Sequence, residues 1–141
     1  MQVAIYGRLI KKDALPYVQQ LFDLLNTRNI KCLIHEEYYP HLVNNIQFKQ
    51  QPEIFYEKEK DKIKNIDFMF SVGGDGTLLD TITIVKDTKV PIVGINIGRL
   101  GFLASIGKDG IEDMIEALEQ GTFSLDERSL IHLDSNMPEL F

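Results

Sequence analysis

Residues 71–77, with the sequence SVGGDGT, form the part of this chain best suited to chemistry. They follow an apolar run and precede an apolar stretch with helical spacing, so we expect a strand, a tight turn and a helix. Gly73, Gly74 and Gly76 permit positive φ angles and let a phosphate approach the backbone N–H groups. The N-terminus of the following helix adds unpaired N–H groups and a positive dipole end, which also favour an anion.

Asp75 lies in the middle of this turn, where a carboxylate would repel a bare phosphate. We interpret it as a base that accepts a proton from a hydroxyl nucleophile, or as a group that orders Mg²⁺ or water beside the phosphate. Thr77 either donates to a phosphate oxygen or caps the helix. The structural alternative is a plain turn in which Asp75 is a capping residue, but the whole string after a buried strand favours the chemical interpretation.

A second segment, residues 96–104 (NIGRLGFLA), follows the strand predicted at 91–95. Both segments leave the carboxyl end of a strand, where open α/β sheets bind ligands. Asn96 offers a donor and an acceptor, and Gly98 permits unusual backbone angles. Phe102 offers a flat face for a base or a nicotinamide ring, with ordinary core packing as an equal alternative.

Several other kinds of site are absent from the sequence. There is no phosphate-binding string ending in Gly-Lys-Ser/Thr, and Leu79 stands where the dinucleotide fingerprint requires its third glycine. No HExxH or GxSxG motif occurs, and His35, His41 and His132 lack metal-ligand spacing. The single cysteine, Cys32, lies in an apolar run and is interpreted as an inert core thiol. We therefore expect no metal site built from protein ligands alone.

Apolar patterning predicts an α/β fold with a mostly parallel, Rossmann-like sheet and flanking helices, because strand and helix periods alternate along the chain. The segment 36–66 is the least clear part, and its charged centre at 57–64 (EKEKDKIK) is interpreted as a solvated loop or an exposed helix. The predicted strands cover residues 3–6, 32–34, 68–72 and 91–95, and the predicted helices are centred on 18–25, 78–85 and 111–118.

The ends and faces of these helices are also predicted. Asp13 is expected to cap the first helix, with Pro16 in its first turn. Leu78, Leu79, Ile82 and Val85 are expected to share the buried face of the second. For the third, we expect Asp109 and Glu112 to form a capping box at the start and Gly121 to end the helix.

Composition excludes several classes of partner. The 141 residues include 15 Lys plus Arg against 21 Asp plus Glu, a net charge of −6, so no nucleic-acid or anionic-membrane partner is expected. No apolar run approaches the ~20 residues of a membrane span, and the start of the chain lacks the shape of a signal peptide. A cytoplasmic location is therefore expected.

The residue pattern changes near the end of the chain. We expect an α/β domain over residues 1–125 and, over 126–141, the opening strand or linker of a further domain, with a strand at 129–134. The terminal Leu140-Phe141 pair would be exposed, so we expect this chain to be an N-terminal piece of a longer protein.

From the first strand to about Leu133, the chain resembles the NAD kinase family through the strings SVGGDGTLL and GINIGRLGFLA. GGDGT alone also fits the superfamily of diacylglycerol kinases, sphingosine kinases and 6-phosphofructokinases, whereas Asn-x-Gly-x-Leu-Gly-Phe is typical of NAD kinases. The resemblance implies an α/β domain followed by a β-rich domain, with the active site between them. It also implies transfer of a phosphoryl group from ATP or polyphosphate, with Mg²⁺, to the 2′-hydroxyl of the NAD adenosine ribose, giving NADP.

The resemblance also assigns roles to residues. It makes Asp75 the general base, and it places Asn96 and Phe102 near the bound nucleotide and Arg8 in a phosphate-facing loop. The family's Asn-Glu pair, which belongs to the β-rich domain, has no counterpart in this sequence. A lipid kinase and a non-catalytic nucleotide-binding module therefore remain alternatives, and the intact protein is expected to be a homo-oligomer. The resemblance assigns Gly73, Gly74 and Gly76 to the phosphate and NAD side, and the turn itself adds Thr77 as a further candidate for binding there.

Overall fold

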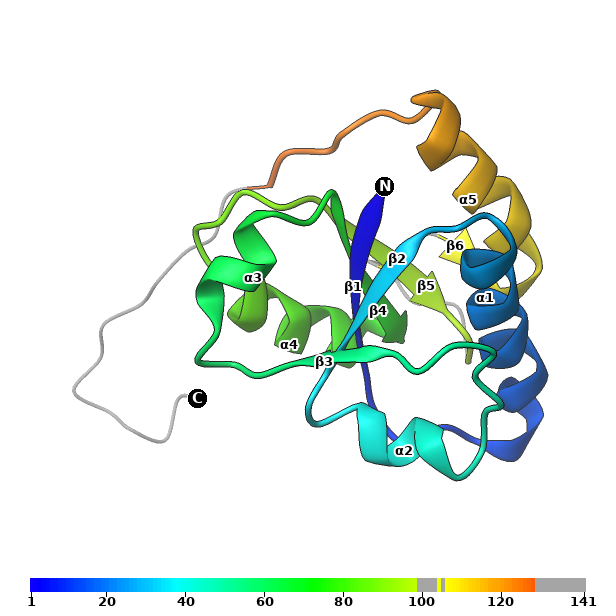
Figure 1. The fold of residues 1–141 in the computed structure, drawn as a ribbon. Helices are drawn as coiled ribbons and strands as arrows, with labels where there is room; N and C mark the ends of the chain where they lie inside the picture. Colours follow the sequence, from blue (N-terminus) through cyan, green and yellow to red (C-terminus); the bar gives the residue numbers. More distant parts are fainter. Residues whose placement is uncertain (99–103, 105, 129–141) are drawn as a thin grey trace, which may run out of the picture.

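A computed structural model describes residues 1–98, 104 and 106–128 and has the predicted α/β architecture (Figure 1). The strands are β1 (Gln2–Gly7), β2 (Lys31–His35), β3 (Glu53–Phe55), β4 (Phe68–Gly73), β5 (Ile92–Asn96) and β6 (Ile106–Gly107). The helices are α1 (Leu15–Thr27), α2 (Tyr39–Val43), α3 (Lys60–Lys64), α4 (Asp75–Val85) and α5 (Ile111–Gln120), with 3₁₀ turns at Lys12–Ala14 and Lys108–Gly110.

The six strands form one parallel sheet in the order β3-β2-β1-β4-β5-β6. This is the strand order of the dinucleotide-binding fold. The first three strands are added toward one side of the sheet and the last three toward the other, so the switch point lies between the two central strands. In this protein those strands are β1 and β4, and Gly7 at the end of β1 pairs with Val72. Gly73, at the end of β4, pairs with Asn96. The predicted site segments therefore begin at neighbouring points on one edge of the sheet.

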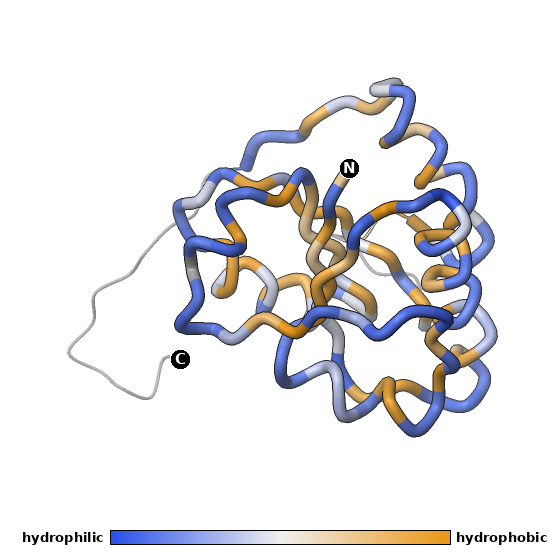
Figure 2. Tube along the Cα trace, viewed as in Figure 1, coloured by the Kyte–Doolittle hydropathy of each residue, from blue (hydrophilic) through white to orange (hydrophobic). Residues whose placement is uncertain are grey.

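Helices cover both faces of the sheet, with α1 and α5 on one face and α3 and α4 on the other (Figure 1). Alternate residues of β1 explain how the two layers are filled: Val3 and Ile5 face α1, whereas Ala4 and Tyr6 face α4. Apolar positions accordingly follow the strands through the interior, and polar positions follow the outer surface (Figure 2). In the described part of the chain, no helix is long and apolar enough to cross a membrane.

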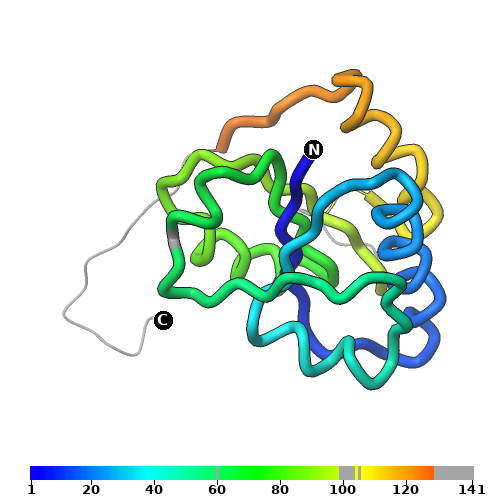
Figure 3. Tube along the Cα trace, viewed as in Figure 1, coloured from blue at the N-terminus to red at the C-terminus, as the bar shows by residue number. Residues whose placement is uncertain are grey.

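The first and last helices lie side by side although they are far apart in the sequence (Figure 3). Arg28, just after α1, donates to Glu119 of α5 at 2.7 Å. Both predicted helices are present, and each buries apolar residues at helical spacing: Val18, Leu21 and Leu25 on α1 and Ile111, Met114, Ile115 and Leu118 on α5.

The predicted helix starts are wrong, but Pro16 and Gly121 behave as expected. A 3₁₀ turn precedes α1, so Ala14 and not Asp13 is its first flanking residue. A second 3₁₀ turn precedes α5, where Gly110 replaces Asp109, and neither helix has a side-chain cap. Pro16 lies in the first turn of α1, and Gly121 ends α5 with a φ of 70°.

The expected buried face of α4 is confirmed only at Val85, whereas Leu78 and Ile82 are half-buried. Leu79 is 54% exposed, and the buried residues are Thr77, Thr81, Ile84 and Val85. The helix has apolar residues on several sides, so its periodicity does not define one face.

The unclear segment 36–66 contains three short elements, α2, β3 and α3. The charged run is partly helical, as one of its two interpretations predicted, and Ile63 anchors it with 2% exposure. The predicted strand at 129–134 lies outside the described residues, and the division at 125/126 stays a prediction.

Candidate nucleotide-phosphate site

The glycine turn at the end of β4 connects the sheet directly to α4. Gly74 flanks the helix with φ −132° and ψ −160°, an extended conformation, and α4 begins at Asp75 without a side-chain cap. Gly73, Gly74, Gly76 and Gly98 do not use the positive φ angles that glycine permits, since Gly121 alone among the described glycines has one. These glycines therefore provide space and not an unusual backbone angle.

The space differs at each position. A Cβ on Gly73 would lie 2.3 Å from Thr77 Oγ1, so glycine is required for α4 to approach β4. A Cβ on Gly74 would meet nothing within 4 Å, which leaves the region before the helix open. Thr77 is buried against Gly73 and does not cap the helix, so its second predicted role, as an N-cap, is wrong.

Asp75 is the first residue of α4 and links the helix to a distant segment. Its Oδ1 accepts the backbone N–H of Ala104, which follows β5, at 3.3 Å. The side chain is half-buried. Its hydrogen bond to Ala104 reaches beyond its own helix, unlike the bond of a purely capping residue. A carboxylate at a helix N-terminus is also stabilised by the helix dipole.

Asn96 ends β5 and shapes the turn that follows. Its side chain is 3% exposed, and its Oδ1 accepts the N–H of Gly98 at 3.0 Å. The N–H of Ile97 donates to the carbonyl of Gly73 at 3.2 Å, which joins this turn to the glycine turn. The two predicted segments thus meet, while Phe102 lies outside the described residues.

Arg8 follows β1 and extends toward the start of α4. Its Nε donates to Asp80 Oδ2 at 2.7 Å, its second terminal nitrogen donates to the same oxygen, and the Tyr6 hydroxyl donates there at 3.1 Å. The hydrogen bond to Asp80 raises the pKa of the Arg8 guanidinium, which stays cationic. The remaining terminal nitrogen of Arg8 lies 3.2 Å from where a Cβ on Gly76 would be.

Tyr6 and Asp80 were not identified from the sequence. Asp80 lies four residues after Gly76, so the helical repeat places both on one side of α4. Tyr6 alternates with Ile5 along β1 and therefore faces α4. Burial raises the pKa of the Tyr6 hydroxyl, so it remains a protonated donor to Asp80.

Two further buried polar side chains lie near the end of β1. The Tyr38 ring packs against Gly7, and a Cβ on Gly7 would lie 2.6 Å from that ring. His35 accepts the N–H of Glu37 on Nδ1 and lies edge-on between the rings of Tyr6 and Phe55. Burial lowers the pKa of His35 and favours its neutral form. Neither His35 Nε2 nor the Tyr38 hydroxyl has a hydrogen-bond partner among the described residues.

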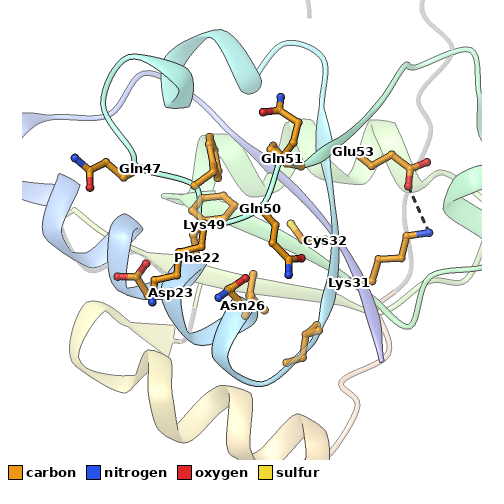
Figure 4. A pocket seen from close by; sticks show the side chains of 14 residues that line it. Phe22, Asp23, Asn26, Lys31, Cys32, Gln47, Lys49, Gln50, Gln51 and Glu53 are labelled. Carbon is orange, nitrogen blue, oxygen red and sulfur yellow. Dashed lines mark ion pairs between the residues drawn. The ribbon is translucent and has the colours of Figure 1, made fainter.

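A hollow of about 290 Å³ lies away from this edge, between the end of α1, β2 and residues 47–53 (Figure 4). None of the predicted site residues lines it. Cys32 does line it, and burial raises the pKa of its thiol, which agrees with the interpretation of an inert cysteine. Among the residues with described placement, no three His, Cys, Asp or Glu side chains could hold a metal ion.

Comparisons with known proteins show the family to which the chain belongs. The model of the ATP-NAD kinase N-terminal domain matches residues 3–123. The chain belongs to the NAD kinase family. It is 39% identical over 136 residues to the NAD kinase of Christiangramia forsetii, covering 96% of this chain and 46% of that protein. It is 41% identical over 138 residues to the NAD kinase of Cytophaga hutchinsonii, with the same two shares.

The fold also resembles that of a solved structure. Yeast NADH kinase complexed with NADH superimposes with a TM-score of 0.66 at 18% identity, covering 85% of this chain and 38% of that one. The chain thus spans about half the length of the curated relatives it matches.

Proposed function

We propose that this chain supplies the nucleotide-phosphate half of an NAD kinase. The whole enzyme would transfer the terminal phosphoryl group of ATP, or of polyphosphate, to the 2′-hydroxyl of the adenosine ribose of NAD. The observation that carries the proposal is the placement of Asp75 at the start of α4, beside the switch point of the sheet and bonded across to Ala104. A base in this position has access to a ligand bound over the carboxyl ends of β1, β4 and β5.

In this mechanism Asp75 orients the ribose hydroxyl and accepts its proton as the oxygen attacks phosphorus. The bond from phosphorus to the leaving ADP, or to the shortened polyphosphate, breaks in the same displacement, so the reaction depends mainly on positioning and charge neutralisation. Backbone N–H groups at the start of α4 and the Arg8 guanidinium hold phosphate oxygens, and Gly74 leaves them room. Asn96, and by family resemblance Phe102, contribute to the nucleotide side.

Magnesium would enter with the nucleotide, because Mg²⁺ usually binds through one or two carboxylates together with substrate phosphates. This pattern fits a chain that offers Asp75 but has no cluster of metal ligands in its described part. When bound, the ion neutralises charge on the phosphate oxygens. The Asp80 carboxylate is already paired with Arg8 and Tyr6.

Another domain or subunit would complete the site. Leu9 is 80% exposed and Leu79 is 54% exposed, and both are next to residues of the Arg8–Asp80 contact. Exposed large apolar side chains around a polar site are typical of a surface that another domain or subunit covers. The β-rich half implied by the family and the expected homo-oligomer are both compatible with that cover.

The test is Asp75→Asn in the protein extended to the full length of its relatives. We expect the fold to persist and NADP formation from NAD and ATP to fall about 10²–10⁴-fold, because a positioned base is lost. Asp113→Asn, an exposed acid on α5, is the matched control and should retain activity. Turnover of Asp75→Asn within about threefold of the parent would remove Asp75 from the mechanism.

A second function, nucleotide binding without turnover, is favoured for the 141-residue chain alone by its half-length coverage of the relatives. Calorimetry of this chain with NAD and with Mg-ATP tests it. Binding without NADP formation supports the module, and the same protein at full length must then show whether turnover appears. The relatives described above are NAD kinases, so no observation favours the lipid-kinase alternative.

A further inference from the structure

One oxygen of Asp80 receives three hydrogen bonds from β1 and the residue that follows it. Two come from Arg8 and one from the hydroxyl of Tyr6, across 72 and 74 residues of sequence. The Arg8 and Asp80 side chains are 54% and 40% exposed, so their ion pair adds little to stability by itself. Tyr6 is 6% exposed, so the pair is attached at one end to a rigid, buried ring.

The contact determines which part of Arg8 remains available. Asp80 takes Nε and one terminal nitrogen, and the other terminal nitrogen lies over Gly76. At the start of α4, the N–H groups of the first residues have no acceptor within the helix. A guanidinium carries five N–H groups in a fixed plane, so holding one edge orients the rest.

We propose that Asp80, supported by Tyr6, is a positioning residue that holds Arg8 over the first turn of α4 so that both bind one phosphate group. The inference rests on the proposed function, because it requires a nucleotide or polyphosphate to bind at this turn. Arg8 makes the contact with the phosphate, and Asp80 acts only through Arg8. Gly76 is part of the arrangement, since a side chain there would occupy the space beside the guanidinium.

Charge alone predicts the opposite result from positioning. Asp80 is an anion beside an anion site, so replacing it with neutral Asn should strengthen phosphate binding if only Coulomb repulsion matters. If Asp80 orients Arg8, the same replacement should weaken binding although a negative charge has been removed. The sign of the change in affinity therefore separates the two explanations.

The experiment is a calorimetric titration of the 141-residue chain with inorganic tripolyphosphate at low ionic strength. We expect Asp80→Asn to bind about tenfold more weakly, which is the low end of the loss when the hydrogen-bond partner of a metal ligand is removed. Asp80→Glu should restore part of the affinity, and Tyr6→Phe should lose less than Asp80→Asn. Glu119→Gln, which breaks the Arg28–Glu119 pair elsewhere, is the control for charge and should bind as the parent does.

A double-mutant cycle shows whether Asp80 acts through Arg8. On the background of Arg8→Ala, Asp80→Asn should cause no further loss, and thermal unfolding should show that all variants remain folded. Equal or tighter binding by Asp80→Asn, or a loss that persists without Arg8, would overturn the inference and leave the proposed function standing. Failure of the parent chain to bind tripolyphosphate would overturn both the inference and the phosphate site of the proposed function.

Discussion

Large aliphatic side chains pack α1 and α5 against one face of the sheet, whereas short polar residues hold the first half of α4 against the other. On the first face, Leu21 of α1 and Ile115 of α5 are fully buried against β1 and β4. On the second face, Thr77 and Thr81 of α4 are buried, and so is Ser71, which alternates with Phe70 and Val72 along β4 and therefore faces the α4 side. The second half of α4 returns to large residues, Ile84 and Val85.

The difference shows that one helix can contribute separately to stability and to the site. Burial of large side chains supplies most of the stabilising free energy. Short residues add less, but they let the backbone of α4 lie close to β4, as the contact between Gly73 and Thr77 shows. The hydroxyl of Thr81 donates to the carbonyl of Thr77 at 2.8 Å, whereas the buried hydroxyl of Ser71 has no hydrogen-bond partner among the described residues. The first half of α4 therefore positions the site more than it stabilises the fold.

The largest effect on stability should come from the aliphatic face. Leu21→Ala should reduce the free energy of unfolding by about 2–5 kcal/mol, because it leaves a cavity in a fully buried position. Urea denaturation measures the loss, and Leu24→Ala, which is only partly buried, is the control with a smaller loss. The amide NMR signals of residues 73–77 should stay in place in the folded protein. Their movement would show that the two faces are not independent.

In contrast to Leu21→Ala, Gly73→Ala should cause a smaller loss of stability but should alter the site directly. The new Cβ would lie 2.3 Å from Thr77 Oγ1, and such overpacking costs about 1–3 kcal/mol. We expect the amide signals of residues 74–77 and of Ala104 to shift as α4 moves away from β4. Gly74→Ala is the matched control, since its Cβ has open space and its backbone is extended. If both variants behave alike, close packing of α4 does not determine the site.

The smallest effect concerns pH and the edge-to-face ring contacts of His35 that join β1, β2 and β3. Burial lowers the pKa of His35 in the folded state, although the nearby acids Glu36, Glu37 and Glu57 oppose this shift. The unfolded chain therefore binds more protons below pH ~6.5, and stability should be complete above that pH and decline as the pH falls toward the folded pKa. The slope is at most about 1.4 kcal/mol per pH unit.

Thermal unfolding between pH 7.5 and 5 should show this decline in the parent and less of it in His35→Gln. His41 lies on α2 and is less buried than His35, so His41→Gln is the control and should show the same decline in stability as the parent. An identical decline in the parent and in His35→Gln would assign the effect to other groups.

The long elements were predictable because each has a strong pattern of its own. Continuous apolar runs identified β1, β4 and β5, and the spacing from Ile111 to Leu118 identified α5. The three-residue β3 was not predictable, since it is a strand only through its pairing with β2. The 3₁₀ turns before α1 and α5 move each helix start one residue beyond the expected cap, to Ala14 and to Gly110 as flanking residues.

By itself the sequence determined the strand-turn-helix at 68–85, the parallel α/β class and the family, because these depend on local runs of residues and on motif strings. Only the tertiary structure decided that Arg8 and Tyr6 meet Asp80, and that Asp75 is bonded to Ala104. These contacts join residues 29 to 74 positions apart, and the order of the strands brings them together. No local pattern records which strands are neighbours, so the geometry of the site follows from the sheet.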